Sequence, residues 1–105
     1  MQSFLCAVVQ MNALKDSLEH NLEVHRSFIR EAGRLGCRFV LFPELSATAH
    51  YGADEVVRFA EPAGDGPVYS ALLDAAHQAN LLVGYGFCEH ARGTYYNAHA
   101  LLGPQ

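Results

Sequence analysis

The sequence predicts an α/β fold with a mixed sheet and the element order β-α-β-α-β-β. Three observations lead to this prediction. Short apolar runs have the length of strands, two segments with helical periodicity separate them, and the connection between the last two runs is too short for a crossover. The chain has 105 residues, half of them hydrophobic and 17% charged, which is typical of one globular domain.

The first strand is predicted over residues 4–11, which are almost continuously apolar, as in a strand buried on both faces. A helix follows, because apolar residues recur every three to four positions over residues 18–35 while charged residues fill the opposite side. Asp16 or Ser17 can cap its first amides, and Gly36 can take the left-handed conformation that ends it.

The second strand is predicted over residues 39–42, which are apolar and bounded by Pro43. The order strand, helix, strand implies a right-handed crossover between parallel strands. Residues 45–66 then lose this pattern, with one helical turn expected around residues 55–59. Long loops in compact domains are usually functional, so we expect this one to contribute to a site.

The second long helix begins at Pro67, a residue favoured in the first helical turn, and ends near Asn80. Residues 81–87 form the third predicted strand. A turn at residues 91–94 leads into a fourth strand over 95–102, which we expect to be antiparallel to the third because so short a connection suits a hairpin.

Composition limits the possible partners and the compartment. The net charge is −4 and there is no run of Lys or Arg, which argues against binding to nucleic acid or to an anionic membrane. The apolar opening is too short and too interrupted to be a signal or a transmembrane span. Three cysteines without a metal-binding spacing indicate a reducing cytoplasm, with no metal.

The most informative segment is FVLFPEL at residues 39–45, where a buried strand leads through Pro43 to Glu44. Ligands of open α/β sheets gather at the carboxyl ends of strands, so Glu44 is placed where chemistry is done. So many apolar neighbours are expected to desolvate this carboxylate, which suits a general base. The alternative is that Glu44 caps the following turn or pairs with a surface arginine.

Five segments of the chain stand out together by their order and spacing: AVVQMN at residues 7–12, NLE at 21–23, FVLFPEL at 39–45, LVGYGFCE at 82–89 and YNA at 96–98. Taken together, they resemble the nitrilase superfamily of carbon-nitrogen hydrolases. FVLFPEL is fairly specific, and the order of all five segments strengthens the resemblance, which covers essentially the whole chain.

The resemblance implies a Glu-Lys-Cys enzyme that hydrolyses non-peptide C–N bonds of small amides or nitriles, with Glu44 as its catalytic glutamate. It implies a fold that is part of an α-β-β-α sandwich, no cofactor or metal, and a homo-oligomer. The only lysine, Lys15, precedes Glu44, whereas the family's lysine and cysteine follow the YN strand. Residues 1–105 therefore resemble a truncated, amino-terminal portion of the domain, expected to be inactive alone.

The family's TGY segment after the glutamate is altered here to Thr48-Ala49-His50-Tyr51. His50 and Tyr51 lie on the long loop beside Glu44, so they are candidates for the lining of a substrate pocket. Loop aromatics also serve as lids on a core, and this alternative stays open.

Other reactive residues and motifs have weaker interpretations. Cys6 and Cys37 are expected to act as small hydrophobic residues and not as reactive thiols, and Cys88 is a poor nucleophile candidate because neighbouring strand residues point to opposite faces. Gly84 and Gly86 lack the third glycine and the helix of a phosphate loop, so close packing in the sheet explains them better. Two rival functions remain: a non-catalytic α/β interaction or binding module, and a flavodoxin-like ligand-binding domain.

Overall fold

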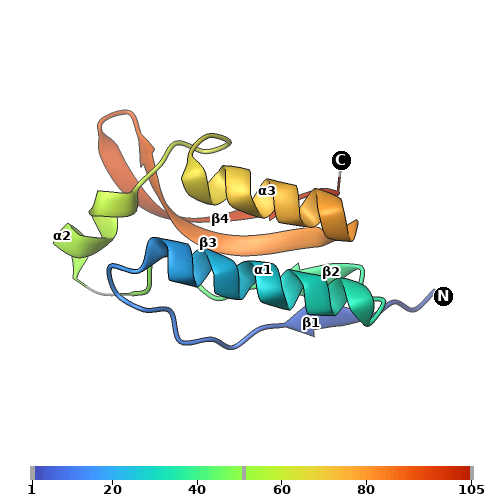
Figure 1. The fold of residues 1–105 in the computed structure, drawn as a ribbon. Coiled ribbons are helices and arrows are strands. Elements are labelled where there is room, and N and C mark those ends of the chain that lie inside the picture. Colours follow the sequence, from blue (N-terminus) through green and yellow to red (C-terminus); the bar gives the residue numbers. More distant parts are fainter. Residues whose placement is uncertain (1, 51, 105) are drawn as a thin grey trace.

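The computed structural model describes residues 2–50 and 52–104, which form a four-stranded sheet with two long helices on one face (Figure 1). The predicted order of elements is confirmed, and the long loop contains two short helical turns. No helix in the described ranges is long and apolar enough to cross a membrane. The elements are β1 (Cys6–Val8), α1 (Leu18–Arg34), β2 (Phe39–Leu41), α2 (Ala53–Val56), the 3-10 turn η1 (Val57–Phe59), α3 (Pro67–Ala79), β3 (Leu82–Ala91) and β4 (Thr94–Leu102).

The sheet is mixed, as predicted, with the strand order β1-β2-β3-β4. β1, β2 and β3 are parallel, with Ala7, Val40 and Val83 in register, and β4 is antiparallel to β3. The parallel strands therefore end together at one edge of the sheet. This edge lies beside α2 and the β3–β4 hairpin, away from both termini in Figure 1.

The core lies between the sheet and the helices α1 and α3. Ile29 of α1 and Leu72 of α3 are fully buried against Val40, Phe42 and Tyr85. Removing a large apolar side chain from water contributes about 1.5–3 kcal/mol each. This single layer of helices therefore fixes one face of the sheet.

The ends of α1 combine a confirmed prediction with a corrected one. Gly36 takes the left-handed conformation with φ of +82° and ends the helix as predicted. Ser17 is the N-cap residue, but its side chain does not cap the helix. The hydroxyl of Ser17 donates to the carbonyl of Lys15 instead, and the carboxylate of Asp16 accepts from Arg58 at 2.6 Å. Both candidate caps are therefore turned to other partners.

α3 begins at Pro67 and ends at Asn80, whose φ of +56° places it in the left-handed region. Its first turn is capped from a distance. The carboxylate of Glu61 accepts hydrogen bonds from the backbone N–H groups of Val68 at 3.0 Å and Tyr69 at 2.9 Å. Burial raises the pKa of Glu61. The sequence analysis did not identify this cap.

The β3–β4 hairpin is longer than predicted. β3 continues to Ala91 and β4 starts at Thr94, so the loop consists of Arg92 and Gly93. Both loop residues have positive φ, 51° and 76°, so the backbone twist of this two-residue turn matches the right-handed twist of the two strands.

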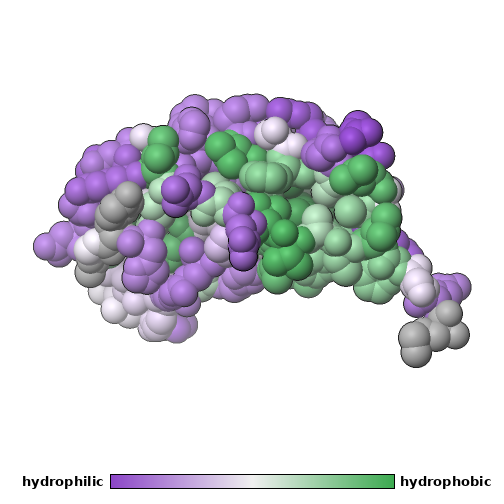
Figure 2. Space-filling view, turned by 90° about the horizontal axis from the view of Figure 1, so that it is seen from below, coloured by the Kyte–Doolittle hydropathy of each residue, from purple (hydrophilic) through white to green (hydrophobic). Residues whose placement is uncertain are grey.

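The opposite face of the sheet carries exposed apolar side chains, so the prediction that the first strand is buried on both faces is wrong. β1 is only three residues long, and its residues Cys6 and Val8 are exposed, Val8 by 76%. Leu41 of β2 and Leu101 of β4 are also exposed on this side. The reason is that α1 and α3 pack on the same face. Figure 2 shows hydrophobic surface gathered on the side where β1 lies.

We expect the 105-residue chain to self-associate through this bare sheet face, because large exposed apolar areas and unpaired strand edges favour association. The weight-average mass in sedimentation experiments should rise with concentration. Val8→Lys should reduce the rise, because it places a charge on the face. Leu35→Lys, at the end of α1, should not. A mass that stays monomeric at all concentrations would contradict this expectation.

Candidate functional site

Glu44 lies at the carboxyl end of β2, where the sequence predicts it. The backbone N–H of Phe42 still donates to the carbonyl of Gly84 at 2.8 Å, so pairing with β3 continues one residue beyond β2. Pro43 follows, and Leu45 then takes a positive φ of 50°. Residues 43–45, here called the Glu44 turn, therefore leave the strand direction immediately.

Two side chains from other segments approach the carboxylate of Glu44. The Asn97 side-chain amide on β4 donates a hydrogen bond to Oε1. His50 Nε2 lies 3.6 Å from the same oxygen, an ion pair whenever the imidazole is protonated. The end of β2, the following loop and β4 thus converge on one carboxylate oxygen.

The side chain of Glu44 is 57% exposed, so the desolvation expected from its apolar neighbours is not provided by the described residues. The reason is the bare face of the sheet. Neither alternative role of Glu44, capping the following turn or pairing with an arginine, is observed among the described residues. The turn after it is closed by backbone bonds from Thr48 and Ala49 to the carbonyl of Leu45. In the described ranges the carboxylate contacts Asn97 and His50, not an arginine.

The loop that follows Glu44 is tied to α1 by two fully buried polar side chains. Asn21 donates from Nδ2 to the carbonyl of Ala47 at 3.0 Å. His25 Nε2 lies 2.7 Å from the hydroxyl of Ser46. Because α1 is held in the core, these bonds fix the position of the loop.

The protonation of His25 follows from its partners. His25 Nδ1 lies 2.6 Å from the backbone carbonyl of Asn21, which can only accept, so Nδ1 carries the proton. Nε2 then accepts from the hydroxyl of Ser46. Burial lowers the pKa of His25. The neutral imidazole therefore serves as a fixed link between helix and loop.

The Glu44 turn also lies very close to β3. A Cβ atom placed on Gly86 would be 2.4 Å from the backbone nitrogen of Leu45 and 2.8 Å from the carbonyl oxygen of Pro43. A side chain at Gly84 would meet the side chains of Leu41 and His99. The prediction that these glycines permit close packing is confirmed.

Two cavities of about 290 Å³ each flank Glu44, and both include Leu45 and His50. The Glu44 cavity is lined by Met11, Asn12, Ala13, Pro43, Glu44, Leu45, Ser46, Ala49 and His50. The tyrosine cavity is mostly apolar and is lined by Leu45, His50, Val56, Val57, Cys88, Tyr95, Tyr96 and Asn97.

A larger hollow, about 550 Å³, is lined by residues of α1 and α3 and shares none of them with the cavities beside Glu44. Its arginines are already engaged: Arg26 and Arg30 bind Glu23, and Arg34 binds Glu31. Since all three arginines of this hollow are held in ion pairs, the cavities beside the carboxylate of Glu44 are the better candidates for a site.

The predicted pocket residues are only partly described. His50 is 68% exposed and lines both cavities beside Glu44, as expected for a residue that can contact a substrate. Tyr51 lies outside the described residues. Their role in substrate binding stays a prediction.

Cys88 has the surroundings of a structural thiol. It is 5% exposed and packs with Leu45 and Val56, and burial raises the pKa of its thiol. A thiol held protonated in this way is a poor nucleophile.

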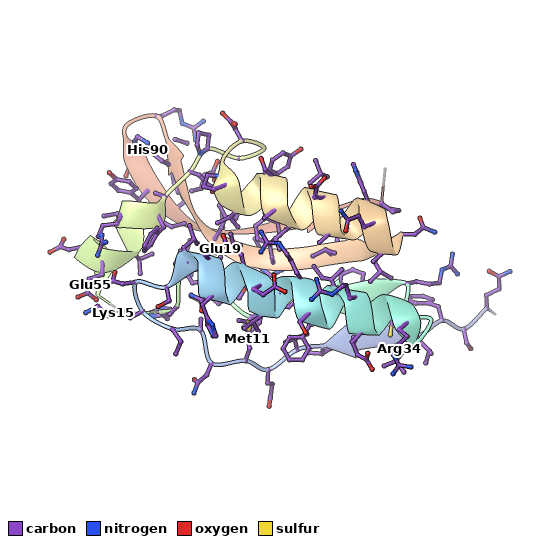
Figure 3. All side chains as sticks on the ribbon, viewed as in Figure 1. Met11, Lys15, Glu19, Arg34, Glu55 and His90 are labelled. Carbon is purple, nitrogen blue, oxygen red and sulfur yellow. The ribbon has the colours of Figure 1, made fainter. Side chains whose placement is uncertain are left out.

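Lys15 Nζ binds Glu55 at 2.5 Å, which joins the segment before α1 to α2 (Figure 3). The described residues contain no group of three or more metal-ligating side chains.

The sequence analysis missed three polar residues that hold the site: Asn97, Asn21 and His25. Asn97 lies in the YNA segment and Asn21 in the NLE segment, so both stood in the motifs that carry the resemblance. Their partners could not be read from the motifs, because each bond spans a long stretch of chain.

A model of the carbon-nitrogen hydrolase family matches residues 5–105. "Nitrilase" of Pyrococcus abyssi (strain GE5 / Orsay) is 28% identical over 101 residues, covering 94% of this chain and 38% of that protein. "Nitrilase 3" of an unknown prokaryotic organism is 31% identical, covering 97% of this chain and 35% of that protein. The chain thus spans about a third of the length of these curated relatives.

The fold itself occurs in known structures. The crystal structure of N-terminal amidase with a Gln-Val peptide matches with a TM-score of 0.83 and 16% identity. The match covers 95% of this chain and 25% of that chain. At this identity the likeness shows the fold, a mixed sheet with helices on one face.

The buried His25 predicts a pH dependence of stability. Its pKa is lowered in the folded state, so below about pH 6.5 the unfolded chain binds a proton more readily than the folded chain. The stability that depends on His25 is therefore fully present above this pH, and it is lost as the pH falls toward the lowered pKa. The slope reaches at most about 1.4 kcal/mol per pH unit.

Urea unfolding between about pH 7.5 and pH 5.5 would measure this loss of stability. His25→Gln should remove this contribution to the slope, because no titrating group remains at the site. His20→Gln, at an exposed position of the same helix, should keep it. An identical slope in the His25 variant would contradict the assignment.

Proposed function

The chain belongs to the carbon-nitrogen hydrolase family, and on this premise we propose that Glu44 is the general base of an enzyme that hydrolyses small amides or nitriles. The observation that carries the proposal is the placement of Glu44. Its carboxylate lies at the carboxyl end of a parallel strand, beside a cavity, with one oxygen held by Asn97.

In the proposed mechanism Glu44 takes the proton of a cysteine thiol, which attacks the amide or nitrile carbon and forms a thioester or thioimidate. Glu44 then passes the proton to the substrate nitrogen, either that of the departing amine or that of the forming thioimidate, and activates water for hydrolysis. A lysine stabilises the developing oxyanion. Neither that lysine nor that cysteine is assigned to this chain, so residues 1–105 are proposed to be the amino-terminal portion of the domain and inactive alone.

The contacts of Glu44 suit this role. Asn97 holds Oε1, whereas no described residue donates a hydrogen bond to Oε2. A carboxylate fixed through one oxygen can present the other to a thiol in a constant direction. His50 Nε2 lies 3.6 Å from the same Oε1, on the side of the carboxylate that Asn97 already holds.

A second candidate function is a non-catalytic interaction module, which the exposed apolar face of the sheet favours. The two proposals differ in what they require of Glu44. An interaction module uses the sheet face and would tolerate the loss of this carboxylate, but a hydrolase would not.

The remaining parts of the proposal concern the setting. We propose a cytoplasmic homo-oligomer that acts on a small molecule without a cofactor, because free cysteines are stable in a reducing compartment and the bare sheet face favours association.

Glu44→Gln in the full-length protein should lower turnover of its amide or nitrile substrate by roughly 100-fold to 10,000-fold, because a carboxamide cannot accept the thiol proton. The melting temperature should stay unchanged, since the carboxamide oxygen still accepts from Asn97. Glu19→Gln, on the exposed side of α1, is the matched control and should keep full activity. Full activity of the Glu44 variant would refute the proposed base.

Asn97→Ala should lower kcat by roughly 10-fold while leaving KM similar, because the carboxylate remains but loses its fixed direction. His99→Ala, two residues further on the same face of β4, tests whether any loss of a polar side chain here has the same effect. Steady-state kinetics of both variants would measure this. Equal kcat values for the two would show that Asn97 has no special role.

A further inference from the structure

Gly86 lies directly beneath the Glu44 turn. Its neighbours on β3, Tyr85 and Phe87, point into the core, so a side chain at Gly86 would point to the opposite face. There it would meet the backbone of the turn, 2.4 Å from the nitrogen of Leu45 and 3.0 Å from the carbonyl carbon of Glu44. Because Gly86 has no side chain, the Glu44 turn can occupy this space.

We propose that Gly86 is a positioning residue for Glu44: the absence of a side chain lets the Glu44 turn lie on β3, which brings the carboxylate to Asn97. This inference rests on the proposed function, because it assigns a role to Gly86 through the proposed base. It extends that function to a residue that does not touch the reacting atoms.

The sheet register explains why the height of the turn above β3 matters. Asn97 lies opposite Cys88 on the β3–β4 ladder, and Gly86 lies opposite His99. The position of Asn97 is therefore fixed relative to Gly86. If the turn rises from β3, Glu44 moves away from Asn97 and their hydrogen bond is lost.

The clash at Gly86 cannot be relieved by rotating a side chain, because the atoms that a Cβ would meet belong to the backbone. The closest distance is about an ångström short of ordinary van der Waals contact. The loop beyond the turn is held to α1 through Ser46 and Ala47, so it cannot follow freely. The Glu44 turn must therefore absorb the displacement.

Gly84 offers a matched control on the same strand and face. Its Cβ would meet Leu41 Cδ1 at 2.9 Å and His99 Nε2 at 3.3 Å. Both atoms are at the ends of side chains that can rotate. Gly84→Ala therefore adds the same methyl group to the same face of β3, but it leaves the Glu44 turn in place.

The first test compares the steady-state kinetics of Gly86→Ala and Gly84→Ala in the full-length protein. A displacement of about 1 Å at a catalytic group costs roughly 100-fold in rate, so Gly86→Ala should lose about this much kcat with KM little changed. Gly84→Ala should keep kcat within a few-fold of the wild type. Equal losses in both variants, or an unchanged kcat in Gly86→Ala, would overturn the proposal.

The second test does not depend on activity. In protein labelled with ¹⁵N-asparagine, the side-chain amide signal of Asn97 should shift when the pH is lowered from neutral to acidic, and Glu44→Gln should abolish this shift. Gly86→Ala should abolish it as well, whereas Gly84→Ala should retain it. A shift that persists in Gly86→Ala, or a Gly86→Ala chain that does not fold, would refute a positioning role.

The two tests separate this inference from the proposed function. If Glu44→Gln is inactive while Gly86→Ala retains its kcat and its Asn97 shift, the base stands and the positioning role of Gly86 fails. If Glu44→Gln is fully active, the proposed function fails. The Asn97 signal then still decides whether Gly86 sets the position of the carboxylate.

Discussion

The contact between the Glu44 turn and strand β3 is the constraint on which the rest of the site depends. Because Pro43 and the left-handed Leu45 end the strand, the chain bends where β3 still continues. Gly86 lets the two backbones meet there. Everything beyond this point is then fixed by its partners: the loop by helix α1, and the carboxylate by Asn97.

Features set by short-range physics could be predicted from the sequence. The helices follow from their apolar spacing, their ends from Gly36 and Asn80, and the site of Glu44 from a strand that ends in proline. Features that join distant residues could not. The Asn97–Glu44 bond spans 53 positions, and no spacing rule relates its two partners. The cap that Glu61 provides to α3 has the same character.

The error over the first strand has a different cause. An apolar run predicts burial on both faces only where helices cover both faces of the sheet. Both long helices of the described residues pack on one face, so Val8 is exposed despite its apolar neighbourhood. The chain spans about a third of the length of its curated relatives.

The same division separates the two properties that the proposed general base needs. The direction of the Glu44 carboxylate depends on Asn97 and on the contact of the Glu44 turn with Gly86, and the described residues supply both. Exclusion of water would need residues packed over the bare face, and the 57% exposure of Glu44 shows that the described residues do not supply it. Position and desolvation therefore have separate origins. A layer packed over the sheet would exclude water from the site without moving the carboxylate, because Asn97 on β4 already holds it in place.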